Sequence, residues 1–440
     1  MAIYFAVMIT PSPHSSTFVY TSNAVLVALS LAGILSEPDR AYSARKFVYF
    51  FIFFFMGLAS LMQFKTGAQT VGGYIIHEGT YTQVNCIMIG VIVLFELSYL
   101  YFYKHIRQPF MHPSVPPGEV EPHRRKQWRT VLLCISVAAS IITIAYYHNE
   151  WVRLISRGVS SAEFDIHRER TLDVYINLGL RWFIRPLTAL CCINYLVMGH
   201  SRKYKIVFLS LMLVAFFPTS LERLRAAVFY MALLIIMFPA LKFKNRFSLL
   251  FLGGILIVFP FLNNFRIWKS AGWSWPKFDL SMFCAPDYDS YQSFAFALQN
   301  KFIDFSGQVF ELFFFWVPRA WWPEKPMPSG FKMAHIYDLD YDFITMNFWG
   351  EGYVFCGFIG IFLFTVALAW LIAKMDRNYW LVFGGSTRNL FAPFYCLFLG
   401  LVFFILRGDL IGAIVESGTI LGLNYLIYRI SLYFLKSNRA

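Results

Sequence analysis

The chain has 440 residues, of which 58% are hydrophobic, 20% are aromatic and only 14% are charged. Soluble domains carry roughly 25% charged residues, so a soluble globular fold is excluded and a lipid bilayer has to cover much of the apolar surface. The net charge of +13 at pH 7 falls mostly in short connections between apolar runs, which argues against nucleic acid as a partner.

Apolar runs recur along the whole chain. Because a spanning helix needs roughly 20 mostly apolar residues, these runs predict an all-α polytopic membrane protein with about eleven transmembrane helices in one integral membrane domain, 1–440. In chain order the predicted helices are 18–36, 47–64, 82–103, 130–147, 179–198, 206–218, 226–241, 247–264, 350–373, 390–406 and 411–433. The pair 206–218 and 226–241 is short, so a re-entrant hairpin is the alternative there.

Lys and Arg are concentrated in alternate connections, which are 37–46, 104–129, 199–205, 242–246, 374–389 and the end 434–440. The positive-inside rule makes these connections cytoplasmic and predicts a multi-pass inner-membrane protein. The basic, Pro-rich connection 104–129 is expected to contact anionic headgroups, with docking of a partner protein as the alternative. Met1–Thr10 is apolar but short, so no cleavable signal peptide is expected.

Two segments on the opposite, periplasmic side are long enough to have structure of their own. Segment 148–178 places Trp151 and Leu154 beside Arg153 and Arg157, a pattern typical of an interfacial amphipathic helix. Segment 265–349 is about 85 residues long, which is too long for a bare connection. We expect it to be a large periplasmic loop that forms a functional subdomain on the membrane surface.

Several arginines lie on the periplasmic side, against the general trend of the charge. Arg223 and Arg225 lie in the turn TSLERLRAA, Arg185 lies one turn inside a predicted helix in RWFIRP, Arg266 follows another, and Arg407 lies in ILRGDL. Charge at a membrane face is usually functional, which makes these residues candidate ligands for an anionic substrate. Snorkelling of each side chain toward headgroups is the alternative.

The most distinctive run of the large loop is FFFWVPRAWWPEKPMPSG, residues 313–330. Its prolines stiffen the backbone and hold Arg319 and Lys325 in a fixed relation beside Trp321 and Trp322. Such a pair of cations suits a pyrophosphate, and the indoles suit the C–H face of a sugar. An aromatic belt at the membrane interface is the alternative.

Acidic residues supply the candidate bases. Glu351 stands between two glycines in FWGEGYV, where it is either a general base near a substrate hydroxyl or a charge partner of the helix start. Asp289 in CAPDYDSYQ is the second candidate, with a turn-forming role as its alternative. Glu96 and Glu416 lie inside apolar helices, so each is expected to pair with an arginine or to mark a polar pathway.

The sequence contains no HExxH, P-loop, GxSxG or metal-ligand cluster. We therefore expect no metal and no cofactor. An activated substrate has to bring its own leaving group.

In organisation the chain resembles the Wzy-type O-antigen or oligosaccharide repeat-unit polymerases. The resemblance rests on the Arg-bearing turn SLERLRAA, the late large outer loop and the ordered set VPRAWWPEKPMPSG, WGEGYVFCGFIG and LRGDL. It implies a GT-C type membrane glycosyltransferase, related to the O-antigen ligases, that needs no metal. Carried over, the family's outer-loop arginines correspond to Arg223 or Arg225, Arg319 and Arg407.

The resemblance also implies the substrate and the partners. The expected substrate is an undecaprenyl-pyrophosphate-linked oligosaccharide, polymerised at the periplasmic face with release of undecaprenyl pyrophosphate. Membrane lipids and a chain-length-regulating membrane protein are the expected partners. The alternatives are an O-antigen ligase of the same superfamily and a lipid-linked oligosaccharide flippase. A transporter is expected to show internal repeats, and none is visible in this sequence.

Overall fold

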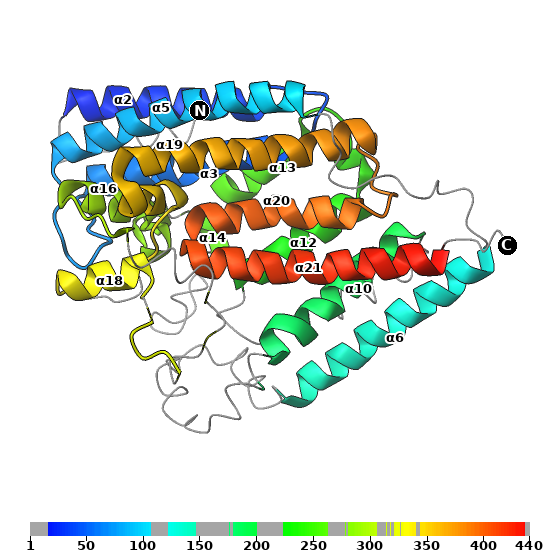
Figure 1. Ribbon diagram of the computed structural model, residues 1–440. Helices are drawn as coiled ribbons and strands as arrows, with labels where there is room; N and C mark the ends of the chain where they lie inside the picture. Colours follow the sequence, from blue (N-terminus) through cyan, green and yellow to red (C-terminus); the bar gives the residue numbers. More distant parts are fainter. Residues whose placement is uncertain are drawn as a thin grey trace. The chain divides into compact units, whose positions relative to one another are not determined.

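The computed structural model describes residues 16–106, 122–146, 176, 179–199, 223–262, 278, 280–305, 314, 317, 321–325, 327–339 and 344–435 (Figure 1). Every regular element in these ranges is helical. The predicted spans fall on helices, except 206–218, which lies outside the described residues. Most of segment 148–178 and much of 265–349 lie outside them as well.

The chain divides into two compact units, which are described separately. The first unit comprises 1–108, 242–376 and 402–415, and the second comprises 109–241, 377–401 and 416–440. The helices of the first unit include α2 (Thr17–Leu35), the continuous run α3–η1–α4 (Ala44–Phe51, Ile52–Ala59, Ser60–Thr66), α5 (Glu78–His105), α13 (Arg246–Gly253), α16 (Ser290–Gln299), α18 (Ser329–Ile336) and most of α19 (Phe348–Arg377). Those of the second include α6 (Pro122–Tyr146), α10 (Arg185–Val197) and α12 (Arg223–Met237), while α20 (Ala392–Arg407) and α21 (Leu410–Leu435) contribute residues to both.

Six helices among the described residues are long and apolar enough to cross a membrane, fewer than the eleven spans expected. They are Thr17–Leu35, Ala44–Thr66, Glu78–His105, His123–Tyr146, Phe348–Val382 and Leu410–Leu435. Shorter apolar helices cover Trp182–Val197, Ala226–Met237, Arg246–Val258 and Ala392–Arg407. A helix of 16 residues is roughly 24 Å long, which is less than the hydrocarbon thickness of about 30 Å. Helix length therefore distinguishes the six candidate spans from the four shorter apolar helices.

The core of the first unit is formed by α2, α3–α4 and α5, with α3–α4 buried throughout its spanning window. Phenyl rings fill this core, and Phe51 and Phe55 stack with centroids 4.8 Å apart while both meet Phe403 at 5.7 Å. In the second unit, α10 packs against α6 and α12. Asn194 on α10 donates to Asn424 Oδ1 on α21 at 2.8 Å, a hydrogen bond between two amides inside apolar surroundings.

Part of the large loop is buried in the helix packing of the first unit. Helix α16 is buried along most of its length and packs on α5 and η1. Tyr291 donates its hydroxyl to Tyr81 O and Asn85 Oδ1, both at 2.9 Å. Gln63 on α4 donates to two carbonyl oxygens of the segment that precedes α16. Side-chain hydrogen bonds thus fasten this part of the loop to α4 and α5.

Candidate active site in the first unit

Helix α19 is folded back on itself near its start. Cys356 and Gly357 have non-helical torsions, with φ of −155° and +61° respectively. The rings of Phe348 and Phe364 are 5.1 Å apart, whereas 16 residues of straight helix span roughly 24 Å. The single ninth helix that the sequence predicted is thus a short arm, a reversal and a long arm.

Glycine at two positions allows this reversal. A Cβ atom on Gly360 would lie 1.8 Å from the carbonyl oxygen of Gly352, and a Cβ on Gly352 would lie 3.0 Å from Gly360 O. Only residues without a side chain let the two backbones approach so closely. The positive φ of Gly357 favours glycine at the turn itself.

Glu351 lies in the first turn of the short arm and is only 1% exposed. Ser329, the first residue of α18, donates its hydroxyl to Glu351 Oε1 at 2.6 Å. Asn347 caps the arm, because its Oδ1 accepts from the backbone N–H groups of Trp349 and Gly350. The structure thus joins the PSG end of the Pro-rich run to the WGEG motif. Glu351 therefore lies at a helix start and also contacts Ser329.

Asp289 is also buried, with 1% exposed, and accepts from Thr345 N at 3.1 Å and from Thr345 Oγ1 at 2.9 Å. Burial raises the pKa of Asp289 to about 6, although the bonds from Thr345 and the charge of Arg407 act in the opposite direction. Asp289 therefore holds the segment that leads into Glu351, and its carboxyl group titrates close to neutrality.

Arg407, at the end of α20, contacts the segment that contains Asp287 and Asp289. Its Nε and Nη2 donate to Asp287 O at 3.1 and 2.7 Å, and Nη2 is 3.9 Å from Asp287 Oδ1. The guanidinium also lies 5.9 Å from the ring centroid of Phe55. Nη1 makes no hydrogen bond with the described part of the chain, so its two N–H groups remain available to a ligand. The three motif regions are thus connected through Ser329–Glu351, Thr345–Asp289 and Asp287–Arg407.

The other predicted residues of the Pro-rich run are not brought to Glu351 by any described contact. Lys325 donates to Val317 O at 3.3 Å, and the exposed fraction of Trp321 is 77%. Trp322 meets Phe314 edge to face with ring centroids 6.1 Å apart. Arg319 and Arg266 lie outside the described residues.

The remaining predicted arginines belong to the second unit. Arg223 and Arg225 lie in the first turn of α12, and their side chains lie outside the description. Arg185 begins α10 and is 1% exposed, so its side chain is packed among helices and does not snorkel to a surface. The pyrophosphate clamp stays a prediction.

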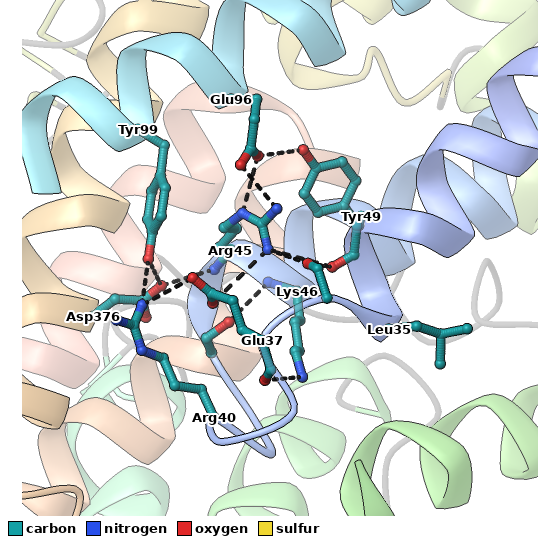
Figure 2. Close-up of polar contacts among 12 residues, drawn as sticks. Leu35, Glu37, Arg40, Arg45, Lys46, Tyr49, Glu96, Tyr99 and Asp376 are labelled. Carbon is teal, nitrogen blue, oxygen red and sulfur yellow. Dashed lines mark hydrogen bonds and ion pairs between the residues drawn. The ribbon is translucent and has the colours of Figure 1, made fainter. Parts of the chain in front are cut away.

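A second polar cluster in the first unit was only partly foreseen (Figure 2). Arg45 holds Glu96 through two bonds, from Nε at 3.0 Å and from Nη2 at 2.9 Å, and Tyr49 donates to the same carboxylate at 2.6 Å. The expectation that Glu96 pairs with an arginine is therefore confirmed. Its partner was not identified from the sequence.

Asp376 at the end of α19 was missed altogether. It is fully buried and accepts from the backbone N–H groups of Ala44 and Arg45 at 2.8 and 3.1 Å, and from the Tyr99 hydroxyl at 3.1 Å. A carboxylate from a distant helix thus caps the start of α3, where N–H groups have no partner within the helix. The available signal was an acid at the end of an apolar run, in a connection otherwise rich in Lys and Arg.

Comparison of the chain with models of protein families, with curated proteins and with solved structures finds no match. Among the described residues, no group of three or more His, Cys, Asp or Glu is arranged to hold a metal ion.

Proposed function

We propose that the chain is a polymerase that joins undecaprenyl-pyrophosphate-linked oligosaccharide repeat units at the periplasmic face of the inner membrane. The observation that carries the proposal is the connection, within one unit, of the PSG, WGEG and LRGD motif regions around two buried carboxylates. These are the motifs on which the resemblance to repeat-unit polymerases rests.

In the proposed reaction a sugar hydroxyl of the acceptor attacks the anomeric carbon of the donor chain. A C–O bond to the acceptor oxygen forms, the C–O bond to pyrophosphate breaks, and undecaprenyl pyrophosphate leaves with the electron pair. Glu351 accepts the hydroxyl proton, with Asp289 as the second candidate base. The free Nη1 of Arg407 and the predicted cations Arg319 and Lys325 stabilise the leaving charge. Arg223 and Arg225 stay predicted ligands of the pyrophosphate.

The arrangement of connections supports the proposed orientation. Segment 37–46 meets Asn245 and Asp376, each from a connection that the charge rule assigns to the cytoplasm. At the other end of α3–α4, Gln63 and Thr70 meet 283–292, which the same rule assigns to the periplasm. The candidate site lies at this second end.

A test needs the purified protein in liposomes with a lipid-linked repeat unit as the only substrate. The proposal predicts a ladder of lengthened glycans and stoichiometric release of undecaprenyl pyrophosphate, and both are lost in Arg407→Ala. Transfer only to lipid A–core would instead identify a ligase, and movement of the substrate between leaflets without glycan growth would identify a flippase.

A further inference from the structure

The bond between Ser329 and Glu351 has the geometry of a base with its substrate. An O–H group that donates to a carboxylate lies about 2.5–2.7 Å from it, and a general base holds the hydroxyl it activates at about 2.6–3.2 Å. Ser329 Oγ is 2.6 Å from Glu351 Oε1. The protein thus supplies a hydroxyl of its own where the proposed reaction requires a sugar hydroxyl.

Both residues of this hydrogen bond are buried. Glu351 is 1% exposed and Ser329 is 4% exposed. A hydroxyl from outside reaches the carboxylate only by replacing a group that now covers it. Among the described contacts of the Glu351 carboxylate, the serine hydroxyl is the one with the chemistry of the incoming group.

We propose that Glu351 Oε1 marks the subsite for the acceptor hydroxyl, and that Ser329 fills this subsite as an internal stand-in until the acceptor displaces it. This inference rests on the proposed function and names the acceptor subsite within it. The ligand class is a saccharide hydroxyl.

The backbone around Ser329 is fixed, so displacement requires only its side chain to move. A Cβ on the neighbouring Gly330 would lie 1.9 Å from Ile344 O, which shows how tightly the start of α18 is packed. Lys332 on α18 pairs with Asp304, whose N–H donates to Val354 O on the short arm of α19. Rotation of the serine about χ1 moves Oγ away from Glu351 and leaves these anchors in place.

The kinetic test compares Ser329→Ala with the wild-type protein at a saturating concentration of donor chains. Removal of the competing hydroxyl should lower the acceptor KM about tenfold at unchanged kcat, since the acceptor no longer has to break a hydrogen bond to a charged group. Ser329→Cys, a weaker donor, should give an intermediate KM. A lower kcat with unchanged KM would overturn the proposal, because it would mean that Ser329 orients Glu351 for catalysis.

Ser293→Ala is the matched control. Ser293 is also buried and also donates its hydroxyl, at 2.9 Å to Thr345 O and at 3.1 Å to Ser290 O, but it does not touch Glu351. The acceptor KM of this variant should equal that of the wild type. An equal fall in the acceptor KM of both serine variants would overturn the proposal, because it would show that loss of any buried serine hydroxyl loosens the packing around the site.

A second readout does not depend on turnover. Glu351 is labelled with a hydrophobic carbodiimide, and the modified peptide is quantified by mass spectrometry in wild type and in Ser329→Ala. The proposal predicts faster labelling in the variant and protection of both proteins by the lipid-linked oligosaccharide. Equal rates in the two proteins would overturn it even if polymerisation were normal. A wild-type protein that shows protection but no polymerisation would refute the proposed function alone.

Discussion

Glu351 combines a position at a helix start with a hydrogen bond from a buried hydroxyl. It lies in the first turn of a helical arm, where the helix dipole stabilises negative charge, and it accepts a short bond from Ser329. The sequence located this residue because its two flanking glycines were conspicuous. The serine partner could not be found that way, because it lies 22 residues earlier in an irregular run.

Replacement of Glu351 separates catalysis from charge stabilisation. Glu351→Gln keeps the size and the acceptor oxygen for Ser329 but removes basicity. We expect normal folding and a fall in polymerisation of about 10²–10⁴-fold, measured from glycan ladders with purified protein. Near-normal ladders would show that Glu351 is structural and would transfer the role of base to Asp289.

Asp289 should make stability depend on pH. Its pKa of about 6 in the folded protein exceeds the ordinary 3.8, so the folded state binds a proton more readily than the unfolded state. This contribution to stability is fully present below pH 3.8 and is lost as the pH rises through about 6, a change of roughly 3 kcal/mol. The midpoint of thermal unfolding in detergent should therefore rise between pH 7 and pH 5. Asp289→Asn should lack that rise, and an unchanged pH dependence in the variant would contradict the assignment.

At the scale of single helices, the sequence was informative wherever an element is determined by its own residues. An apolar run of sufficient length predicts a helix by itself, and the predicted spans 18–36, 47–64 and 82–103 each match a helix within a few residues. The fold-back of α19 was not visible, because GEGYVFCGFIG reads as one continuous apolar helix. A contact between Gly352 and Gly360 is tertiary information that local periodicity does not contain.

The glycine contact in α19 predicts a large difference between two similar substitutions. Gly360→Ala forces a Cβ against the Gly352 carbonyl and should destabilise the protein by roughly 3 kcal/mol. A Cβ at Gly90 on α5 meets nothing within 4 Å, so Gly90→Ala should raise stability by up to about 1 kcal/mol. Thermal unfolding in detergent measures both effects. Equal stability of the two variants would argue against the hairpin.

The Arg45–Glu96 pair should behave as a partly buried ion pair between α3 and α5. Glu96→Gln leaves the guanidinium with only the longer contact to Glu37, 3.8 Å from Nη1, and should destabilise the protein by roughly 2–3 kcal/mol. The double variant Arg45→Met and Glu96→Met should recover much of that loss, because it removes both charges together. If the double variant lost as much stability as the single variants Arg45→Met and Glu96→Met together, the two residues would not be coupled.

On the scale of the whole molecule, the pattern of Lys and Arg predicted which connections share an end of the helix bundle. The charge rule grouped 37–46, 242–246 and 374–389, and in the structure the Lys46 side chain meets Asn245 while the backbone N–H of Ala44 meets Asp376. The docking of α16 was not predictable, since it depends on hydrogen bonds between residues more than 200 positions apart. Six of the about eleven expected crossings coincide with described helices long enough to span a membrane, and the full count stays a prediction.

Cysteine labelling in intact cells tests which end faces the periplasm. Ile75 and Asp39 are both exposed and lie beyond opposite ends of α3–α4. In a background with the seven native cysteines replaced by alanine, an impermeant maleimide should label Ile75→Cys and spare Asp39→Cys. The reverse pattern would invert the proposed topology.

The cap that Asp376 provides for α3 has a consequence for biosynthesis. Ala44 leaves the ribosome 332 residues before Asp376, and at about 5–20 residues per second that interval lasts roughly 20–70 s. Throughout this time the early helices are already in the membrane, while the first N–H groups of α3 and the hydroxyl of Tyr99 await their acceptor. The helices of the amino-terminal quarter therefore reach their final arrangement only near the end of translation, and in a chain cut short before α19 these polar groups stay without the Asp376 carboxylate.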